Sequence, residues 1–136
     1  MCGIVGALHR ADASFNLARG VSVLAHRGPN DHGVWEAPGV QLGFTRLSIL
    51  DLSAAGHQPM QSPDGRYVIV FNGEIYNFQA LRKTLESAGE MFVGHSDTEV
   101  LLRLFMRDGF EACLQRLRGM FAFAVWDREK IGRAHV

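Results

Sequence analysis

The sequence predicts an α+β domain in which antiparallel β-sheet is covered by helices. The chain has 136 residues, 47% of them hydrophobic, which suits one domain with a substantial core. Strand and helix patterns do not alternate regularly, so a doubly wound parallel sheet is disfavoured. Neighbouring strand patterns are joined by turn-forming residues, as in antiparallel hairpins.

The first half of the chain contains one helix pattern among three strand patterns. Apolar residues at helical spacing predict a helix over Ala13–Ala25, with Ser14 positioned as its N-cap. Strands are expected over Ile4–Leu8, Val34–Trp35 and Val40–Leu47, the last two joined by a turn at Pro38-Gly39.

The second half is richer in helix patterns. The β-branched and aromatic run Tyr67–Phe71 predicts a buried strand, which we expect to end in a tight turn at Asn72-Gly73. The remaining expected elements are helices over Phe78–Ala88, Asp97–Met106 and Phe110–Leu117 and a strand over Met120–Trp126.

Composition excludes several classes of function. The chain has 14 basic and 14 acidic side chains, so it offers no net positive charge to a nucleic acid or an anionic membrane. No apolar run approaches the length of a membrane span. Cys2 and Cys113 lie far apart and form no C-x-x-C pair, so a zinc site lacks ligands at short spacing. A disulfide between them is possible, but no pattern in the sequence supports it. We therefore expect a cytoplasmic protein with free thiols, a small-molecule substrate and no bound metal.

Cys2 directly follows Met1, and this position has its own chemistry. Once Met1 is removed, Cys2 carries both a thiol and a free α-amine. A model thiol titrates at about 8.5 and an α-amine at about 8, so the amine can act as base for the thiol. By position alone an inert cysteine is the commoner case, but the strand over Ile4–Leu8 ties this terminus into a core.

Four further residues suggest a site for a free amino acid with a side-chain amide. Asn72 and Gly73 can offer a side-chain NH2 and a backbone N–H to an oxyanion, although an ordinary hairpin turn is the alternative. Arg46 can grip an α-carboxylate. Asp97 can bind an α-ammonium or, more commonly, serve as a helix N-cap. We expect the loop His26–Pro29 to shape the rim of the pocket.

Together these residues resemble a known family. The chain is similar to the glutaminase domain of class II glutamine amidotransferases, in particular that of the glutamine-hydrolysing asparagine synthetases. Other class II enzymes share the cysteine start but lack the Arg-Leu-Ser-Ile and Asn-Gly-Glu-Ile-Tyr-Asn motifs. The resemblance rests on Met1-Cys2-Gly3-Ile4-Val5-Gly6, His26–Pro29, Arg46-Leu47-Ser48-Ile49, Asn72-Gly73-Glu74-Ile75-Tyr76-Asn77, Ser96-Asp97-Thr98-Glu99 and Gly119–Ala124.

The resemblance implies an N-terminal nucleophile hydrolase fold, a four-layer αββα sandwich of antiparallel sheets. It assigns Cys2 the role of nucleophile and makes Asn72 and Gly73 the oxyanion hole. The residues that it assigns to glutamine binding are Arg46, Leu47, Ile49, Glu74 and Asp97.

The resemblance also implies what lies outside this domain. The glutaminase domain itself needs no cofactor. ATP and Mg²⁺ belong to a C-terminal synthetase domain, absent from this chain, which uses the ammonia to convert aspartate to asparagine. A homodimer of the full-length protein is left open. Two alternatives remain: delivery of ammonia to another acceptor, and a non-catalytic glutamine-binding module.

The end of the chain departs from the family pattern. Ile131-Gly132-Arg133-Ala134-His135-Val136 is what one reading frame of a common sequencing-library adapter encodes. We therefore expect a partial glutaminase domain over residues 2–129, a non-native tail over residues 130–136, and a fold that is truncated at its C-terminus.

Overall fold

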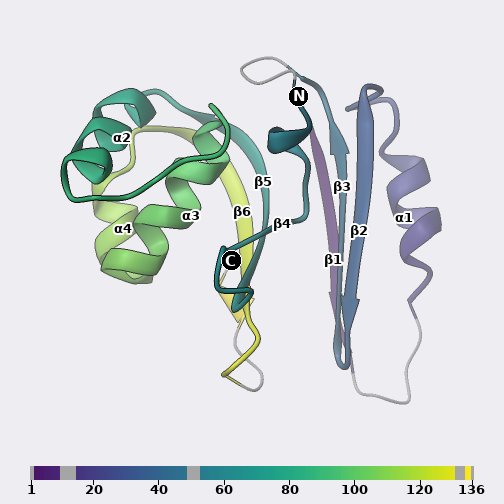
Figure 1. The fold of residues 1–136 in the computed structure, drawn as a ribbon. Helices are drawn as coiled ribbons and strands as arrows, with labels where there is room; N and C mark the ends of the chain where they lie inside the picture. Colours follow the sequence, from purple (N-terminus) through teal and green to yellow (C-terminus); the bar gives the residue numbers. More distant parts are fainter. Residues whose placement is uncertain (1, 10–14, 49–52, 131–133, 136) are drawn as a thin grey trace.

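Two β-sheets lie face to face between layers of helices in the computed structural model, which describes residues 2–9, 15–48, 53–130 and 134–135. Figure 1 shows the two sheets in the middle, with α1 on one side and α2, α3 and α4 on the other. All strand pairs within the sheets are antiparallel in the described residues. The predicted α+β class and its four αββα layers are confirmed.

The first sheet has the strand order β1-β3-β2, made of β1 (Gly3–Leu8), β3 (Val40–Arg46) and β2 (Asp31–Ala37). Strands β2 and β3 form the predicted hairpin, in which Ala37 pairs with Val40. Strand β1 pairs along the whole of β3, with Gly3 opposite Thr45. The first residues of the chain therefore lie beside the end of β3.

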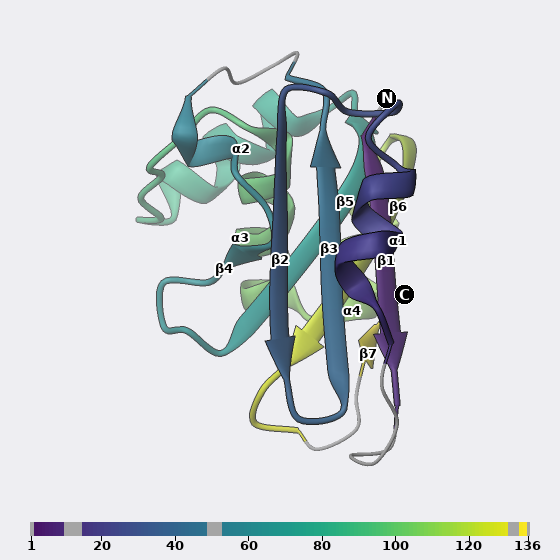
Figure 2. The ribbon, with the colours of Figure 1, turned by 90° about the vertical axis from the view of Figure 1, so that its right-hand side faces the viewer.

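Helix α1 (Leu17–Val23) covers the outer face of this sheet, as Figure 2 shows. It begins later than predicted, because Asn16 is the N-cap: its side chain accepts a hydrogen bond from the N–H of Arg19 at 3.0 Å. Ser14, the predicted cap, lies outside the described residues. The helix packs closely on the sheet at Gly43, where an added Cβ would lie 2.6 Å from Val21.

The second sheet has the order β4-β5-β6-β7, and β5 (Tyr67–Ile75) and β6 (Gly119–Asp127) are its long strands. The predicted turn at Asn72-Gly73 is wrong, because β5 continues through both residues to Ile75. Strand β6 pairs with β5 along this whole length, and long-range pairing overrides the local turn preference. The short edge strands are β4 (Met60–Gln61) and β7 (Ala134–His135).

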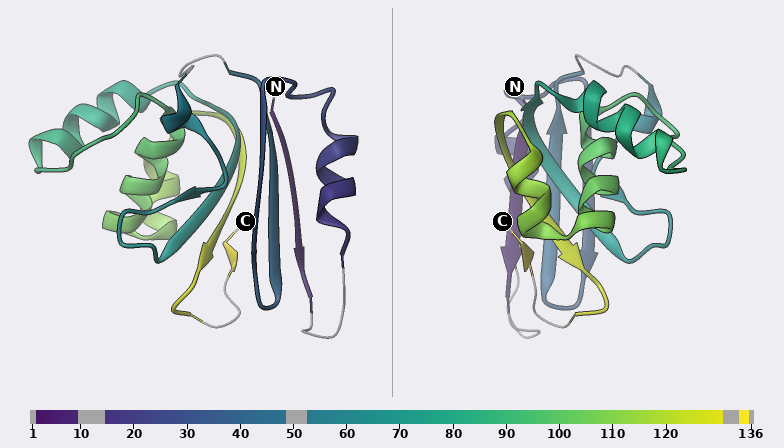
Figure 3. Two further views of the ribbon diagram at one scale, coloured as in Figure 1. Left: turned by 45° about the vertical axis from the view of Figure 1, so that its right-hand side comes forward. Right: turned by 90° about the vertical axis from the view of Figure 1, so that its left-hand side faces the viewer.

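Helices α2 (Phe78–Ser87), α3 (Asp97–Asp108) and α4 (Phe110–Arg116) cover the outer face of the second sheet, and they are the green helices of Figure 3. Alternate residues of β5 face opposite sides. Ile69 and Phe71 pack with the helices in the larger apolar cluster. Val68 and Val70 pack against the first sheet in the smaller one. Because both faces of β5 are buried, its sequence is continuously apolar before Asn72.

Part of the expected tail can be placed. Lys130 follows β6, and Ala134 and His135 pair with Trp126 and Val125. Residues 131–133 and 136 lie outside the described residues. In the part of the chain that is described, no helix has the length and apolar character needed to cross a membrane.

Candidate active site

A cavity of about 160 Å³ opens where the start of β1, the end of β3, the second half of β5 and the N-terminus of α3 meet. It collects the predicted site residues from all four elements. Those that line it are Cys2, Arg46, Leu47, Asn72, Gly73, Glu74 and Asp97. Ile49, the remaining predicted site residue, lies outside the described residues.

Cys2 is a half-buried free cysteine held at the rim of the first sheet. Its Sγ accepts a hydrogen bond from the N–H of Leu47 at 3.3 Å and lies 3.6 Å from the carbonyl oxygen of the same residue. The side chain also packs against the apolar cluster between the sheets. The thiol is thus fixed at one wall of the cavity by the end of the neighbouring strand.

The loop His26–Pro29 supports Cys2 from behind. Arg27 Nε donates a hydrogen bond to the carbonyl oxygen of Cys2 at 3.0 Å. Gly28 lets the loop approach the end of β3, because an added Cβ would lie 2.5 Å from the backbone nitrogen of Arg46. The described lining residues of the cavity include none from this loop, which contacts the lining residues Cys2 and Arg46 from behind. Only the fold reveals that Arg27 anchors the N-terminal strand.

Arg46 is the last residue of β3, and its side chain is mostly buried. One guanidinium nitrogen, Nη1, donates to the carbonyl oxygen of Ser53 at 2.9 Å. The other side of the guanidinium packs against Gly56, where any added Cβ would overlap Nη2. The segment 53–56 therefore fixes a planar cation at the cavity wall, a geometry suited to a carboxylate.

Asn72 and Gly73 are adjacent on β5 at the opposite wall of the cavity. The Oδ1 atom of Asn72 is buried, and no donor among the described residues reaches it. Unpaired buried polar atoms are uncommon in folded proteins. Gly73 has a φ of 153°, and an added Cβ would overlap the backbone of Met120 on β6. Only glycine allows the strands this close approach.

Asp97 is the first residue of α3 and is 5% exposed. Its Oδ2 accepts a hydrogen bond from the N–H of Ile75 at 3.0 Å. The N-cap is Ser96, whose hydroxyl accepts from the N–H of Glu99 at 3.2 Å, so the alternative role of Asp97 as N-cap is wrong. Burial raises the pKa of Asp97, and the nearby charge of Glu74 adds to this, although backbone hydrogen bonds oppose it.

Gln58 is a cavity residue that sequence reasoning missed. Its side chain is 4% exposed and bonds at both ends, accepting from the N–H of Phe71 at 2.6 Å and donating to Thr98 Oγ1 at 3.2 Å. It lies in a segment with turn-forming residues, where nothing in the local sequence marks a buried polar side chain. Its role depends on partners 13 and 40 positions away along the chain.

The site therefore combines a thiol, a guanidinium, an amide and a buried carboxylate. Within the described residues there is no cluster of three or more His, Cys, Asp or Glu side chains that could hold a metal ion. The arrangement offers a nucleophile together with opposite charges for the two ends of a free amino acid.

Comparison with known proteins defines the class of this domain. Residues 1–134 match the model of the glutamine amidotransferase domain family, and the chain belongs to this family.

Two relatives are named as glutamine-hydrolysing asparagine synthetases. A Mycobacterium bovis protein provisionally named as a glutamine-hydrolysing asparagine synthetase is 48% identical over 128 residues, which cover 86% of this chain and 19% of the relative. Asparagine synthetase 1 of Bacillus subtilis is 42% identical over 134 residues, which cover 94% of this chain and 21% of the relative. The chain thus spans about a fifth of the length of these relatives and is homologous to their glutaminase portions.

A solved structure supports the fold. The glutamine phosphoribosylpyrophosphate amidotransferase of B. subtilis superposes with a TM-score of 0.79 at 21% identity, covering 94% of this chain and 35% of that one. The chain therefore has the fold of the N-terminal nucleophile amidotransferases.

Proposed function

We propose that this domain hydrolyses glutamine with Cys2 as nucleophile and supplies the ammonia to asparagine synthesis. One observation carries the proposal: Cys2, Arg46, Asn72 and Asp97, which come from four separate elements, line a single cavity.

In the proposed reaction, the free α-amine of Cys2 takes the proton of the thiol. The thiolate attacks the side-chain amide carbon of glutamine, and the carbonyl oxygen becomes an oxyanion. Asn72 Nδ2 and the N–H of Gly73 stabilise this oxyanion. The tetrahedral intermediate collapses to a thioester as ammonia leaves with the transferred proton. Water then attacks the thioester, which releases glutamate and regenerates the thiol.

The charged residues select and orient the substrate. Arg46 pairs with the α-carboxylate, while Asp97 and the nearby Glu74 attract the α-ammonium. Leu47 and Ile49 complete the glutamine-binding segment after β3. Fixing both ends of the amino acid holds its amide in reach of Cys2, so that the attack becomes effectively intramolecular.

The acceptor of the ammonia is proposed from the relatives, two of which are named as glutamine-hydrolysing asparagine synthetases. In this scheme ATP and Mg²⁺ act in a synthetase domain outside these 136 residues. We place the reaction in the cytoplasm, where the free thiols Cys2 and Cys113 stay reduced.

The test compares wild type and Cys2→Ala, each expressed from the complete gene. Intact mass first confirms that Met1 is removed, and glutamate release from glutamine is then measured. Removal of the nucleophile should lower the rate by about 10³-fold or more. Equal rates would exclude Cys2 from the mechanism. Aspartate- and ATP-dependent asparagine formation in the same preparation tests the acceptor.

A further inference from the structure

Gln58 connects three layers of the fold beside the cavity. Its backbone lies against the first sheet, because a Cβ at Gly33 of β2 would overlap the carbonyl of Gln58. Its side chain reaches both the second sheet, at Phe71, and α3, at Thr98. These two contacts lie next to Asn72 and Asp97 in the sequence.

The side chain of Gln58 takes the place of strand pairing at the edge of β5. Strand β4 pairs with β5 only at Val68 and Ile69. Two residues further on, the N–H of Phe71 donates to Gln58 Oε1 instead. This bond holds the segment of β5 that leads into Asn72, where pairing with β4 has ended.

An uncharged amide satisfies both ends of this bridge. The N–H of Phe71 requires an acceptor, so the other end of the side chain must be the NH2 group, which donates to Thr98 Oγ1. A glutamate could accept from both the N–H of Phe71 and the hydroxyl of Thr98, but it would bring another negative charge into the cavity that Glu74 and Asp97 line.

The segment around Gln58 is itself anchored to the first sheet. His57 Nδ1 lies 2.7 Å from Asp31 Oδ2 on β2. The same segment supports the guanidinium of Arg46 through Ser53 and Gly56. The residues before Gln58 thus hold the cation, while Gln58 bonds the two elements that carry Asn72 and Asp97.

We propose that Gln58 is a positioning residue that keeps the oxyanion donors on β5 at the correct distance from the ammonium-binding carboxylate on α3. This inference rests on the proposed glutaminase function. Without the bridge, substrate still binds through its charged ends, but its amide no longer sits squarely on Asn72 and Gly73. The loss therefore falls on kcat more than on KM.

The experiment uses the protein expressed from its complete gene and follows glutamate release. Gln58→Met keeps the volume of the side chain and removes both hydrogen bonds. We expect kcat to fall about tenfold or more while KM changes less than about threefold. The rate at which iodoacetamide alkylates Cys2 should stay at the wild-type value, because the thiol is held by β1 and β3.

A matched pair at Thr98 decides the inference if Gln58→Met does not fold. Thr98→Val removes only the acceptor of the Gln58 Nε2 bond, whereas Thr98→Ser keeps the hydroxyl. We expect Thr98→Val to lower kcat and Thr98→Ser to restore it, with both unfolding midpoints close to wild type.

Two results would overturn the inference. One is wild-type kcat in both Gln58→Met and Thr98→Val. The other is a parallel fall of kcat, thiol alkylation and unfolding midpoint, which would mark a purely structural role. If Cys2→Ala also hydrolyses glutamine at the wild-type rate, the proposed function itself fails. If Cys2→Ala loses activity but the Gln58 and Thr98 variants keep the wild-type kcat, only the positioning role is rejected.

Discussion

Among the described residues, a single helix of seven residues covers the first sheet, whereas three helices cover the second sheet. The larger apolar cluster lies on the helix side of the second sheet, and the smaller one lies between the sheets. Yet the proposed nucleophile and the guanidinium both belong to the thinly covered first sheet. The region with the larger apolar core is therefore distinct from the region that holds the proposed nucleophile.

The largest expected effect is on stability and differs between the two sheets. Leu101 in α3 is fully buried in the larger cluster, whereas Leu17, the first residue of α1, packs toward Gly43 on β3. Leu101→Ala should lower the free energy of unfolding by about 4 kcal/mol and Leu17→Ala by about 2 kcal/mol, since a tightly enclosed cavity cannot relax. Urea unfolding measures both. Equal losses of unfolding free energy in the two variants would mean that the two outer helix layers contribute equally to stability.

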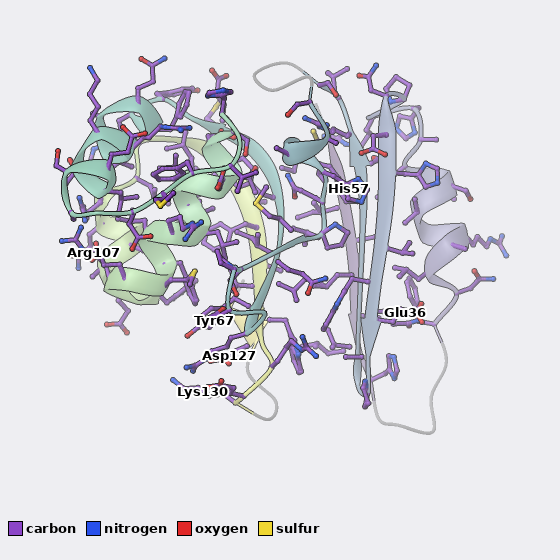
Figure 4. All side chains as sticks on the ribbon, in the orientation of Figure 1. Glu36, His57, Tyr67, Arg107, Asp127 and Lys130 are labelled. Carbon is purple, nitrogen blue, oxygen red and sulfur yellow. The ribbon has the colours of Figure 1, made fainter. Side chains whose placement is uncertain are left out.

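The next effect tests the cation of the first sheet. Arg46→Lys keeps the charge but loses the planar fork that matches a carboxylate. We expect KM for glutamine to rise by about 100-fold, with a smaller change in kcat. Arg107→Lys, on the exposed side of α3 in Figure 4, is the matched control and should behave as wild type. A wild-type KM in Arg46→Lys would exclude bidentate pairing of Arg46 with the α-carboxylate of glutamine.

A pH profile tests the carboxylate that faces this cation across the cavity. Burial raises the pKa of Asp97 above its ordinary value of 3.8, so it loses its charge at a higher pH than an exposed aspartate. As pH falls through this raised value, KM for glutamine should rise by up to about tenfold per pH unit.

Asp97→Asn provides the control for this profile. The variant should show a high KM for glutamine that does not change with pH across the range in which Asp97 titrates in the wild type. Because the pKa is raised in the folded state, ionised Asp97 costs stability above that pKa, so the variant should unfold no earlier than wild type at neutral pH. A marked loss of stability in Asp97→Asn would contradict this assignment.

The smallest expected effect concerns the far end of the second sheet. Arg66 donates two hydrogen bonds to Asp127, at 2.9 and 2.8 Å. Asp127 pairs with Tyr67, and both residues are labelled in Figure 4. These bonds lower the pKa of Asp127 despite its burial. The stabilisation is therefore complete above the unfolded value of about 3.9 and is lost as pH falls through the lower folded value.

Acid unfolding measures this contribution. Asp127→Asn should be slightly less stable at neutral pH and should show a shallower loss of stability below about pH 4. Its glutaminase activity should match wild type, because the pair lies far from the cavity residues along β5. An unchanged acid transition would show that the pair adds nothing to stability.

Several features of the site could be read from the sequence. Local patterns placed Cys2 beside a buried strand, Arg46 at a strand end and Asp97 at a helix start. The structure brings these three residues to one cavity. The Asn72-Gly73 pair was also singled out, although its predicted turn is in fact strand. Local turn preference could not anticipate that β6 pairs with every residue of β5.

What the sequence by itself determined are the features that depend on near neighbours: the continuous apolar run of β5, the apolar faces of α2 and α3, and the chemistry of an N-terminal cysteine. Only the tertiary structure decided how these parts meet. Arg27 supports Cys2 from 25 positions away, and Gln58 joins β5 to α3 across 13 and 40 positions. Such contacts leave no local pattern, because the partners of a buried polar group are chosen by packing between layers rather than by the residues beside it.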